Sequence, residues 1–151
     1  MMKKMMTVLL ALCFVLTAAC AETAPDTLME KAIRIAEDGE DLIRQSEDDV
    51  YDGLGIEPED YTDWAYLSGR ESLLGRELLV FRAVDEEAAE RIAELLEGYR
   101  QYHMEMTRNY PDQAEKYRAL SEAEVKRKGL MVVLSVDAPD PAEAELLLQE
   151  E

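Results

Sequence analysis

The stretch Leu78-Leu79-Val80-Phe81-Arg82-Ala83-Val84 is apolar at six of its seven positions. An apolar residue at nearly every position is typical of a β-strand that is covered on both faces. Met131-Val132-Val133-Leu134 has the same character further along the chain. The two segments therefore predict core strands of a sheet that has helices on one or both of its faces.

A long helix is predicted directly after the first of these strands. Asp85 is suited to cap this helix, and the two glutamates that follow lie in its first turn, where negative side chains are favourable. Apolar and aromatic residues then recur at helical spacing as far as Asn109, before Tyr110-Pro111 ends the helix. They are Ala88, Ile92, Leu95, Leu96, Tyr99, Tyr102, His103 and Met106.

The C-terminal third of the chain predicts a short helix, a hairpin and a final helix. Residues 113–120 have helical spacing, and residues 122–128 and 130–137 form two strand-like runs that turn at Lys128-Gly129. Asp140-Pro141-Ala142-Glu143 then opens the last helix, with Asp140 as its cap and the proline at its first position.

The N-terminal part of the domain predicts one helix and one strand. Thr27-Leu28-Met29-Glu30 fits a capping box, and helical spacing continues with Leu42 and Ile43 as its extension and residues 46–49 as its polar end. Residues 50–63 are rich in turn residues, with one helical turn expected at Pro58, and residues 63–67 fit a strand. The order helix, strand, strand, long helix, strand, strand, helix predicts an α+β fold with a mostly antiparallel sheet.

Residues 1–19 have the layout of a bacterial lipoprotein signal peptide. Two lysines at positions 3 and 4 precede an uncharged, mostly apolar run over residues 7–16, which is too short to span a bilayer. Leu16-Thr17-Ala18-Ala19 leads to Cys20. The alternatives are an ordinary secretory signal with a chance cysteine, or a short buried helix. We expect cleavage after residue 19, and acyl chains such as palmitate on Cys20.

Three segments are therefore expected: the removed leader over residues 1–19, the lipidated cysteine and a tether over residues 20–26, and a single domain over residues 27–151. Cys13 leaves with the leader, so the mature domain has neither a disulfide nor a free thiol. The full chain has a formal charge of −18, and the leader holds two of its sixteen basic residues and no acidic one. This charge argues against nucleic acid as a partner and against electrostatic binding to anionic lipid.

Several segments in this order resemble a family of small bacterial lipoproteins, typical of Gram-positive anaerobes, that is defined by a domain of unknown function. The resemblance extends over residues 50–144 and implies secretion, lipidation and this order of elements. It transfers no catalytic residues. The segments that carry it are Tyr51 with Leu54-Gly55-Ile56, Arg76 to Ala83, Glu97 to Gln101, Tyr110-Pro111, and Gly129 to Asp137.

Asp48, Asp52 and Glu59 are the nearest approach to a metal motif. With Gly53 they match positions 1, 5, 12 and 6 of a calcium-binding loop, but Val50 stands at position 3, where an oxygen ligand is required. The alternative is a solvated turn, which we favour. We therefore expect neither a metal nor another cofactor.

Aromatic and basic residues offer the remaining candidates. Trp64 and Tyr66 lie on one face of the predicted strand, either packed in the core or exposed as a platform for a sugar or another ligand. His103 suits a general base, but its expected surroundings favour a partly buried or surface histidine. Lys126-Arg127-Lys128 suits either a solvated end that protects an edge strand or a patch for a partner.

We expect a non-enzymatic lipoprotein on the extracytoplasmic face of the cell membrane, whose domain binds an envelope protein or a small ligand. No nucleophile motif supports an enzyme. Two alternatives stay open at this point. One is a cell-wall or glycan hydrolase that uses paired carboxylates, and the other is a calcium-responsive module.

Overall fold

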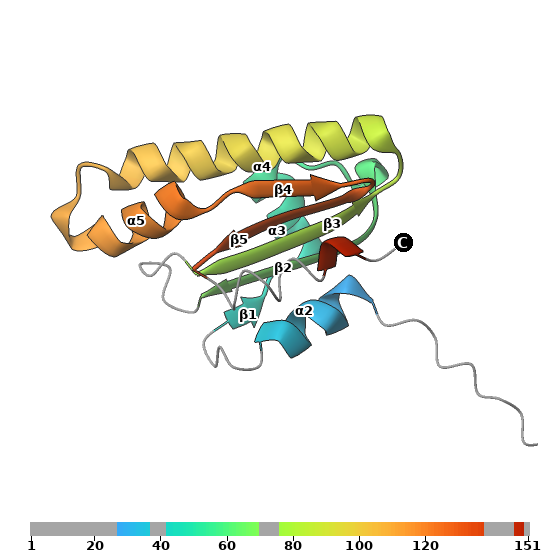
Figure 1. The fold of residues 1–151 in the computed structure, drawn as a ribbon, viewed down its shortest axis with the longest axis horizontal. Helices are drawn as coiled ribbons and strands as arrows, with labels where there is room; N and C mark the ends of the chain where they lie inside the picture. Colours follow the sequence, from blue (N-terminus) through green and yellow to red (C-terminus); the bar gives the residue numbers. More distant parts are fainter. Residues whose placement is uncertain (1–26, 37–41, 70–75, 138–146, 150–151) are drawn as a thin grey trace, which may run out of the picture.

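The computed structural model describes residues 27–36, 42–69, 76–137 and 147–149 (Figure 1). Its strands form an antiparallel sheet in the order β1-β2-β3-β5-β4. The predicted α+β class and antiparallel sheet are confirmed. The strands are β1 (Leu42–Arg44), β2 (Tyr61–Gly69), β3 (Glu77–Ala83), β4 (Val125–Lys128) and β5 (Met131–Val136).

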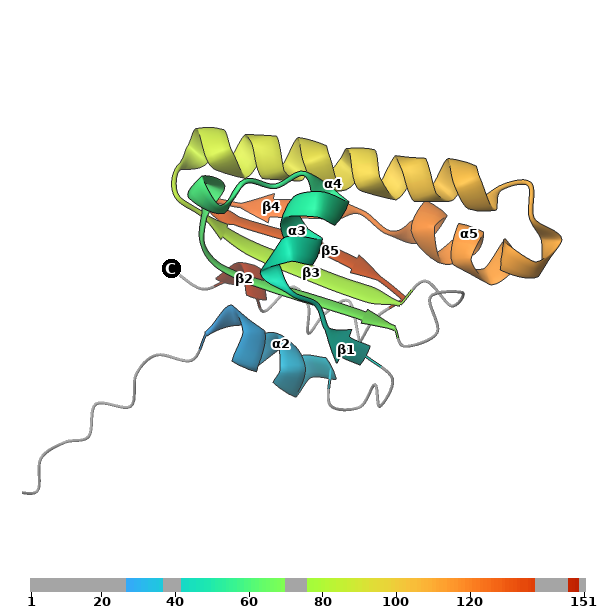
Figure 2. The same ribbon diagram turned by 180° about the vertical axis from the view of Figure 1, so that it is seen from behind.

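Helices cover both faces of this sheet. The face that we call the α4 face carries α4 (Glu86–Thr107), α3 (Glu47–Leu54) and α5 (Ala114–Glu122). The opposite face, which we call the α2 face, carries α2 (Leu28–Ala36) and the 3₁₀ turn η3 (Leu147–Gln149). Figures 1 and 2 show α4 and α2 on opposite sides of the strands.

The central strand β3 alternates between the two faces. Leu79 and Phe81 belong to the core of the α4 face, whereas Leu78 and Val80 belong to the core of the α2 face. All four side chains are fully buried. The prediction of a doubly covered strand is therefore confirmed, with β3 starting at Glu77 and ending at Ala83.

The long helix α4 follows as predicted. The Asp85 carboxylate accepts a hydrogen bond of 2.8 Å from the backbone N–H of Ala88 and caps the helix. Ile92 and Leu96 lie one turn apart and are buried against the sheet. The helix ends at Thr107, slightly before the predicted Asn109, and a 3₁₀ turn, η2 (Pro111–Gln113), leads to α5.

The prediction for residues 42–54 was wrong. Leu42–Arg44 is a strand and not a continuation of the first helix, and Ser46 starts a new helix. The Ser46 hydroxyl and the Asp49 carboxylate form a capping box, and Gly55 ends α3 with a φ of 70°. A strong cap begins a helix because it satisfies the free N–H groups of the first turn.

The start of the domain agrees better with its prediction. The Thr27 hydroxyl accepts from the N–H of Glu30, and the Glu30 carboxylate accepts from the N–H of Thr27, as in the predicted capping box. Asp63 of β2 accepts from the N–H of Leu28 at 2.9 Å, which fixes α2 to the sheet. The helical turn predicted at Pro58 is η1 (Pro58–Asp60), and β2 is longer than predicted at both ends.

The predicted hairpin is formed by β4 and β5, which turn at Gly129 and Leu130. Gly129 has a φ of 57°, a conformation that glycine adopts without steric cost. The first strand begins at Val125 and not at Glu122, which is the last residue of α5. The helix predicted from Asp140 lies outside the described residues, apart from the turn η3.

Candidate functional site

A shallow groove between α4 and β4 is the first candidate site. Its volume is about 570 Å³, and one wall comes from α4 while the other comes from β4. Because β4 is the last of the described strands in the sheet order, the groove lies along an edge of the sheet that pairs with no other described strand. The lining residues are Glu90, Ala93, Glu94, Glu97, Gly98, Gln101, Val125 and Arg127.

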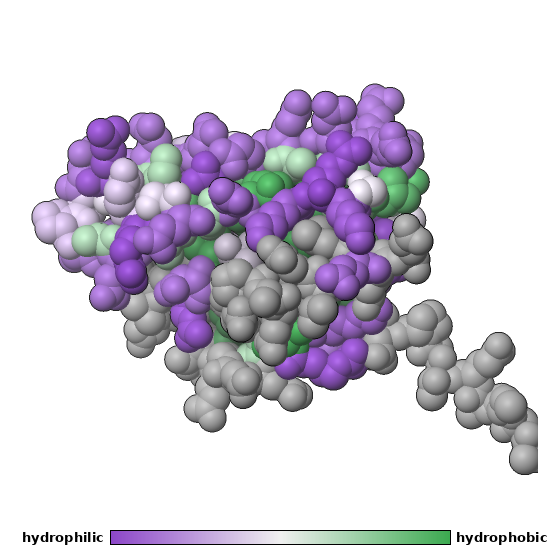
Figure 3. All heavy atoms as spheres, in the orientation of Figure 1, coloured by the Kyte–Doolittle hydropathy of each residue, from purple (hydrophilic) through white to green (hydrophobic). Residues whose placement is uncertain are grey.

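The α4 wall is acidic. Glu90, Glu94 and Glu97 follow one another at spacings of four and three residues, so they form one stripe along the helix. Glu90 and Glu94 are exposed, and neither makes an ion pair or a side-chain hydrogen bond within the part of the chain that the structure describes. Their charges are therefore open to a partner. Figure 3 shows hydrophilic side chains around apolar surface below α4.

Glu97 is held in place by neighbours on its own helix. Both of its oxygens accept from Arg100, at 2.6 and 2.9 Å, and Gln101 donates to it at 2.7 Å. The hydrogen bond from Arg100 holds the pKa of the Glu97 carboxyl below its usual value. Arg100 also donates to the backbone carbonyl of Leu120 at 2.8 Å, which ties this wall to α5. The third carboxylate of the stripe is therefore fixed and charged.

Gly98 is an exposed residue of the α4 wall. A Cβ atom placed on this glycine would meet no other described atom within 4 Å. Its backbone is helical, so no left-handed conformation requires glycine there. Glycine inside a helix costs roughly 0.5–1 kcal/mol relative to alanine. The residue thus leaves space that the described structure does not use.

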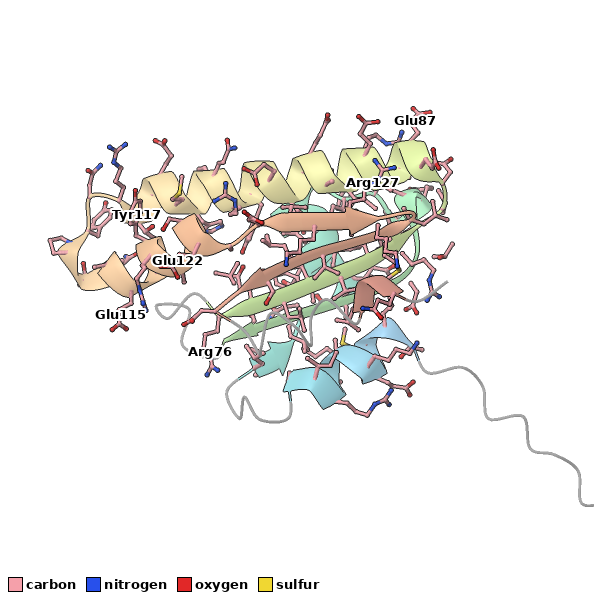
Figure 4. The ribbon with its side chains drawn as sticks, viewed as in Figure 1. Arg76, Glu87, Glu115, Tyr117, Glu122 and Arg127 are labelled. Carbon is pink, nitrogen blue, oxygen red and sulfur yellow. The ribbon has the colours of Figure 1, made fainter. Side chains whose placement is uncertain are left out.

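The β4 wall carries Val125 and Arg127, whose side chains point to the α4 face. Figure 4 shows Arg127 below the N-terminal half of α4. Its Nε donates to the backbone carbonyl of Gly129 at 3.2 Å, which directs the side chain toward the hairpin turn. The acidic residues therefore dominate the remainder of the groove.

A second candidate is a buried polar cluster made by Tyr66 of β2, Glu77 of β3 and Tyr99 of α4. The Tyr99 hydroxyl donates to the Glu77 carboxylate, with distances of 3.0 and 2.8 Å to its two oxygens. The Tyr66 and Tyr99 hydroxyl oxygens lie 3.3 Å apart. Because Tyr99 directs its proton to Glu77, Tyr66 donates to Tyr99.

The surroundings of this cluster favour its uncharged forms. Burial raises the pKa of Glu77, although the hydrogen bond from Tyr99 and the charge of Lys116 act in the opposite direction. Burial and then the charge of Glu77 raise the pKa of Tyr66 to about 12, and the same causes raise the pKa of Tyr99. Neither phenol is therefore activated as a nucleophile.

His103 lies at the border of this cluster. Its ring centroid is 4.4 Å from that of Tyr99 and 5.4 Å from that of Tyr102. Burial and then the charge of Lys116 lower the pKa of His103. The side chain is half-buried, which agrees with the packing interpretation that we favoured from the sequence. The cluster positions α4 over the sheet, and its described hydrogen bonds are directed inward.

The two predicted aromatic candidates are packed side chains. Tyr66 is only 9% exposed and belongs to the core of the α4 face. Trp64 is half-buried, contacts the cores of both faces, and makes an edge contact with Tyr61 at a centroid distance of 6.3 Å. A ligand platform at these two residues stays a prediction. In the structure, the Tyr66 hydroxyl group belongs to the buried polar cluster.

The candidate calcium ligands do not form a loop. Asp48 and Asp52 lie within α3, and Glu59 lies in η1. A calcium loop has to curl around its ion, whereas residues 47–54 are helical. Within the described ranges, no group of three or more histidine, cysteine, aspartate or glutamate side chains is arranged to hold a metal ion.

Two further sequence candidates have different outcomes. The run Lys126-Arg127-Lys128 forms most of β4, which is an edge strand as the sequence suggested.

Cys20 lies outside the described residues. Among the helices that are described, none has the length and apolar character needed to cross a membrane.

Sequence reasoning missed the acidic stripe, Gly98 and Glu77. A glycine inside a long helical pattern is a visible signal, and so are acidic residues spaced by four and three positions. Glu77 gave no signal, because it stands directly before the apolar run from Leu78 and resembles an ordinary strand end.

Comparison with known proteins identifies the domain but no activity. A family model described as "Domain of unknown function (DUF4358)" matches residues 36–137. No curated protein and no solved structure matches the chain.

Proposed function

Since the chain belongs to this family of domains of unknown function, we propose a function from its own residues: a lipid-anchored, extracytoplasmic binding module. Its ligand site is the α4–β4 groove. The family match agrees with the resemblance only in assigning residues 36–137 to a domain of unknown function. The match concerns the domain, so the anchor and the location rest on the leader pattern alone.

The anchor is the acylated Cys20. A basic n-region, a short apolar run and small residues before the cysteine support it. The acidic charge of the chain disfavours electrostatic attachment to anionic lipid, so acyl chains have to supply the binding energy. Each buried methylene contributes about 0.8 kcal/mol, and durable anchoring takes two or more chains.

The fold suits attachment at this point. Residues 21–26 separate the cysteine from the Thr27 cap of α2, and six extended residues span at most about 22 Å. The α2 face is therefore expected to lie nearest the membrane. The groove lies beside α4, on the other side of the sheet (Figure 1). A ligand could then approach it from the side that faces away from the lipid.

The observation that carries the binding function is the open groove itself. Among the described residues, it combines a sheet edge that pairs with no further strand, two glutamates without an ion pair and a helical glycine whose Cβ position meets no other side chain. Glycoside hydrolysis would require two carboxyl groups on either side of the scissile bond. In this groove the carboxylates come from the α4 wall, whereas Val125 and Arg127 form the opposite wall. This one-sided arrangement favours binding over hydrolysis.

Lipidation is tested on the full chain produced in a bacterial host that is fed an alkyne-labelled fatty acid. We expect the label on the membrane-bound protein, and its loss in the Cys20→Ser variant. Protease added to intact spheroplasts should degrade the domain. Label that persists in Cys20→Ser, or protection from the protease, would contradict the proposed anchor or location.

Binding in the groove is tested in the same host with a photo-crosslinking amino acid at position 98. Position 53 is the matched control, because Gly53 is also a helical glycine with no described atom near its Cβ position. We expect a crosslinked adduct from position 98 and none from position 53. Equal crosslinking at the two positions, or none at either, would rule against the groove as the ligand site.

A further inference from the structure

We propose that residues 99–122, which comprise the C-terminal half of α4, the turn η2 and α5, form a helical flap that opens from the sheet as one unit. Gly98 is the boundary of this flap, and the hydrogen bond between Tyr99 and Glu77 is its latch. The N-terminal half of α4 stays packed when the flap opens. This motion goes beyond the proposed binding function, because it requires no ligand in the groove.

Burial divides α4 into two unlike halves. The side chains of its first half that are fully buried in the core of the α4 face are Ala88, Ala89, Ile92 and Leu96. Between Leu96 and the end of this helix, Thr107 is the one buried residue, and its hydroxyl contacts carbonyls of its own helix. Figures 1 and 2 show the second half and α5 extending beyond the ends of the strands. The apolar packing that holds the first half is therefore largely missing from the second half.

Gly98 lies at the boundary between the two halves. Glycine is the weakest helix former apart from proline, and residues that absorb a conformational change between packed parts are often small. Across this boundary, Arg100 and Gln101 donate to the Glu97 carboxylate. Such pairs within one helix stabilise it only modestly. The helix is therefore most easily interrupted at this point.

The second half of α4 is joined directly to α5. Arg100 donates to the backbone carbonyl of Leu120 at 2.8 Å, and η2 connects the two helices. Within residues 99–122, the buried side chains are Thr107, Ala119 and Leu120. Segments with few buried apolar contacts open at a lower free energy than the rest of a protein. Since Leu120 is the one large side chain that the closed flap buries fully, opening costs less than global unfolding.

Glu77 is the residue of the sheet to which both helices of the flap are fastened. The Tyr99 hydroxyl of α4 donates to its carboxylate, and the charge of Lys116 on α5 acts on the same group. Glu77 lies on the central strand β3, between Ser68 of β2 and Val136 of β5, so it stays with the sheet when the flap opens. A hydrogen bond to a carboxylate is stronger than one between neutral groups. Loss of the Tyr99 bond should therefore favour the open form.

Opening is measured by thiol labelling at two buried valines of β5. Val136 pairs with Glu77 and Val132 pairs with Phe81, and both valines are fully buried in the core of the α4 face. Because α4 follows β3 and runs back along it, Val136 lies near Tyr99, whereas Val132 lies toward the packed half of the helix.

Val136→Cys and Val132→Cys are made separately in the full chain, which is purified in mild detergent and treated with iodoacetamide. Mass spectrometry of the peptide that contains the new thiol gives its labelling rate, so other cysteines do not interfere. We expect position 136 to react about tenfold faster than position 132, or more, because local opening is more frequent than global unfolding. The rate at position 136 should also depend weakly on urea, since the flap exposes little surface, whereas the rate at position 132 should rise steeply.

The latch is tested in the Val136→Cys chain. Tyr99→Phe removes the donor to Glu77 and should raise the labelling rate about fivefold or more. Tyr102→Phe, at an exposed tyrosine of the same helix, should leave the rate unchanged. Ile92→Val weakens the half of α4 that stays packed, so it should accelerate position 132 about two- to tenfold and leave position 136 unchanged.

The boundary is tested in the same chain. Gly98→Ala should slow labelling of position 136 about two- to fivefold, because alanine favours the intact helix. Gly53→Ala strengthens α3, which stays closed, so it should leave this rate unchanged. Fraying of the end of β5 would instead be insensitive to Gly98→Ala.

Hydrogen exchange shows whether the two helices open together. Tyr99→Phe should accelerate exchange in residues 103–107 and 118–122 by the same factor. Acceleration in one of these segments without the other would overturn the single unit. Equal labelling of positions 136 and 132, a rate at position 136 that Tyr99→Phe does not raise or Gly98→Ala does not lower, or an equal effect of Ile92→Val at both positions would overturn the flap.

Discussion

The two faces of the sheet are built from the same strands but are covered in different ways. The α2 face has an apolar core in which Leu78, Val80 and Val133 pack against a helix of nine residues. The α4 face adds the buried Glu77 cluster and borders the open groove. The α2 face is thus closed by apolar packing, whereas the α4 face combines a larger core with a buried polar cluster and an open groove.

The short helix α2 depends on the sheet that it covers. Isolated helices of fewer than about 12–15 residues are marginal in water. Leu28 and Ala32 are fully buried, and the Asp63 hydrogen bond fixes the first turn. The α4 helix has 22 residues and several partners on the same sheet. We therefore expect the α4 face to contribute more to the global free energy of unfolding.

The largest predicted effect tests this comparison with one truncation on each face of β3. Phe81→Ala should lower the free energy of unfolding by about 3–5 kcal/mol. Leu78→Ala should cost less, within about 2–5 kcal/mol for a buried leucine. Phe81 removes more apolar surface and also loses an edge contact with Tyr61 at 5.7 Å. Urea unfolding followed by circular dichroism measures both values.

If Leu78→Ala costs as much as Phe81→Ala or more, the α2 face is the main source of stability and the comparison fails. Hydrogen exchange of the α2 amides provides a second measurement of the difference in stability between the two faces. Exchange through local opening is expected in α2, because this helix can separate while the sheet and α4 stay folded.

The second prediction concerns the polar cluster that distinguishes the α4 face. Tyr99→Phe removes the donor to Glu77 and should cost about 1–3 kcal/mol, as expected when a buried polar group loses its partner. The cost should grow with pH. Glu77 has a raised pKa in the folded state, so its contribution to stability is present at low pH and is lost as pH rises through that pKa.

Loss of the Tyr99 hydrogen bond raises the pKa of Glu77 further, so the decline in stability extends to higher pH and becomes larger in total. The free energy of unfolding is measured from pH 4 to pH 8 for the wild type and for Tyr99→Phe. In a Glu77→Gln background, the same change should cost an amount that is independent of pH. A pH-dependent cost in that background would assign the effect to another group.

Much of the fold could be predicted from the sequence. The apolar run from Leu78 predicted a strand buried on both faces, and Asp85 predicted the start of α4. These features depend on local hydrophobic patterns and on capping residues, which are visible in the sequence itself. The error at residues 42–54 had a tertiary cause, because β1 is a short strand whose pairing with β2 carries no local signal.

The candidate site was less predictable. Tyr66, Glu77 and Tyr99 come from three elements, and the sheet register and the packing of α4 bring their polar atoms together. To predict the groove, one would likewise have to know that β4 is the edge strand and that it lies beside α4. Sequence patterns identify the acidic stripe and Gly98 as unusual, but they do not show which element lies opposite.

The smallest predicted effect concerns Gly98, at the point where the α4 side is left open. Gly98→Ala should raise the free energy of unfolding by about 0.5–1 kcal/mol, because alanine loses less backbone entropy in a helix. The added methyl group meets no described atom within 4 Å, so no clash offsets this gain. Gly53→Ala in α3 is the matched control and should also be stabilising. If Gly98→Ala destabilises the protein while Gly53→Ala does not, another part of the chain fills the groove at Gly98. The α4 side would then be closed like the α2 face, and the difference between the two faces would lie in the Glu77 cluster alone.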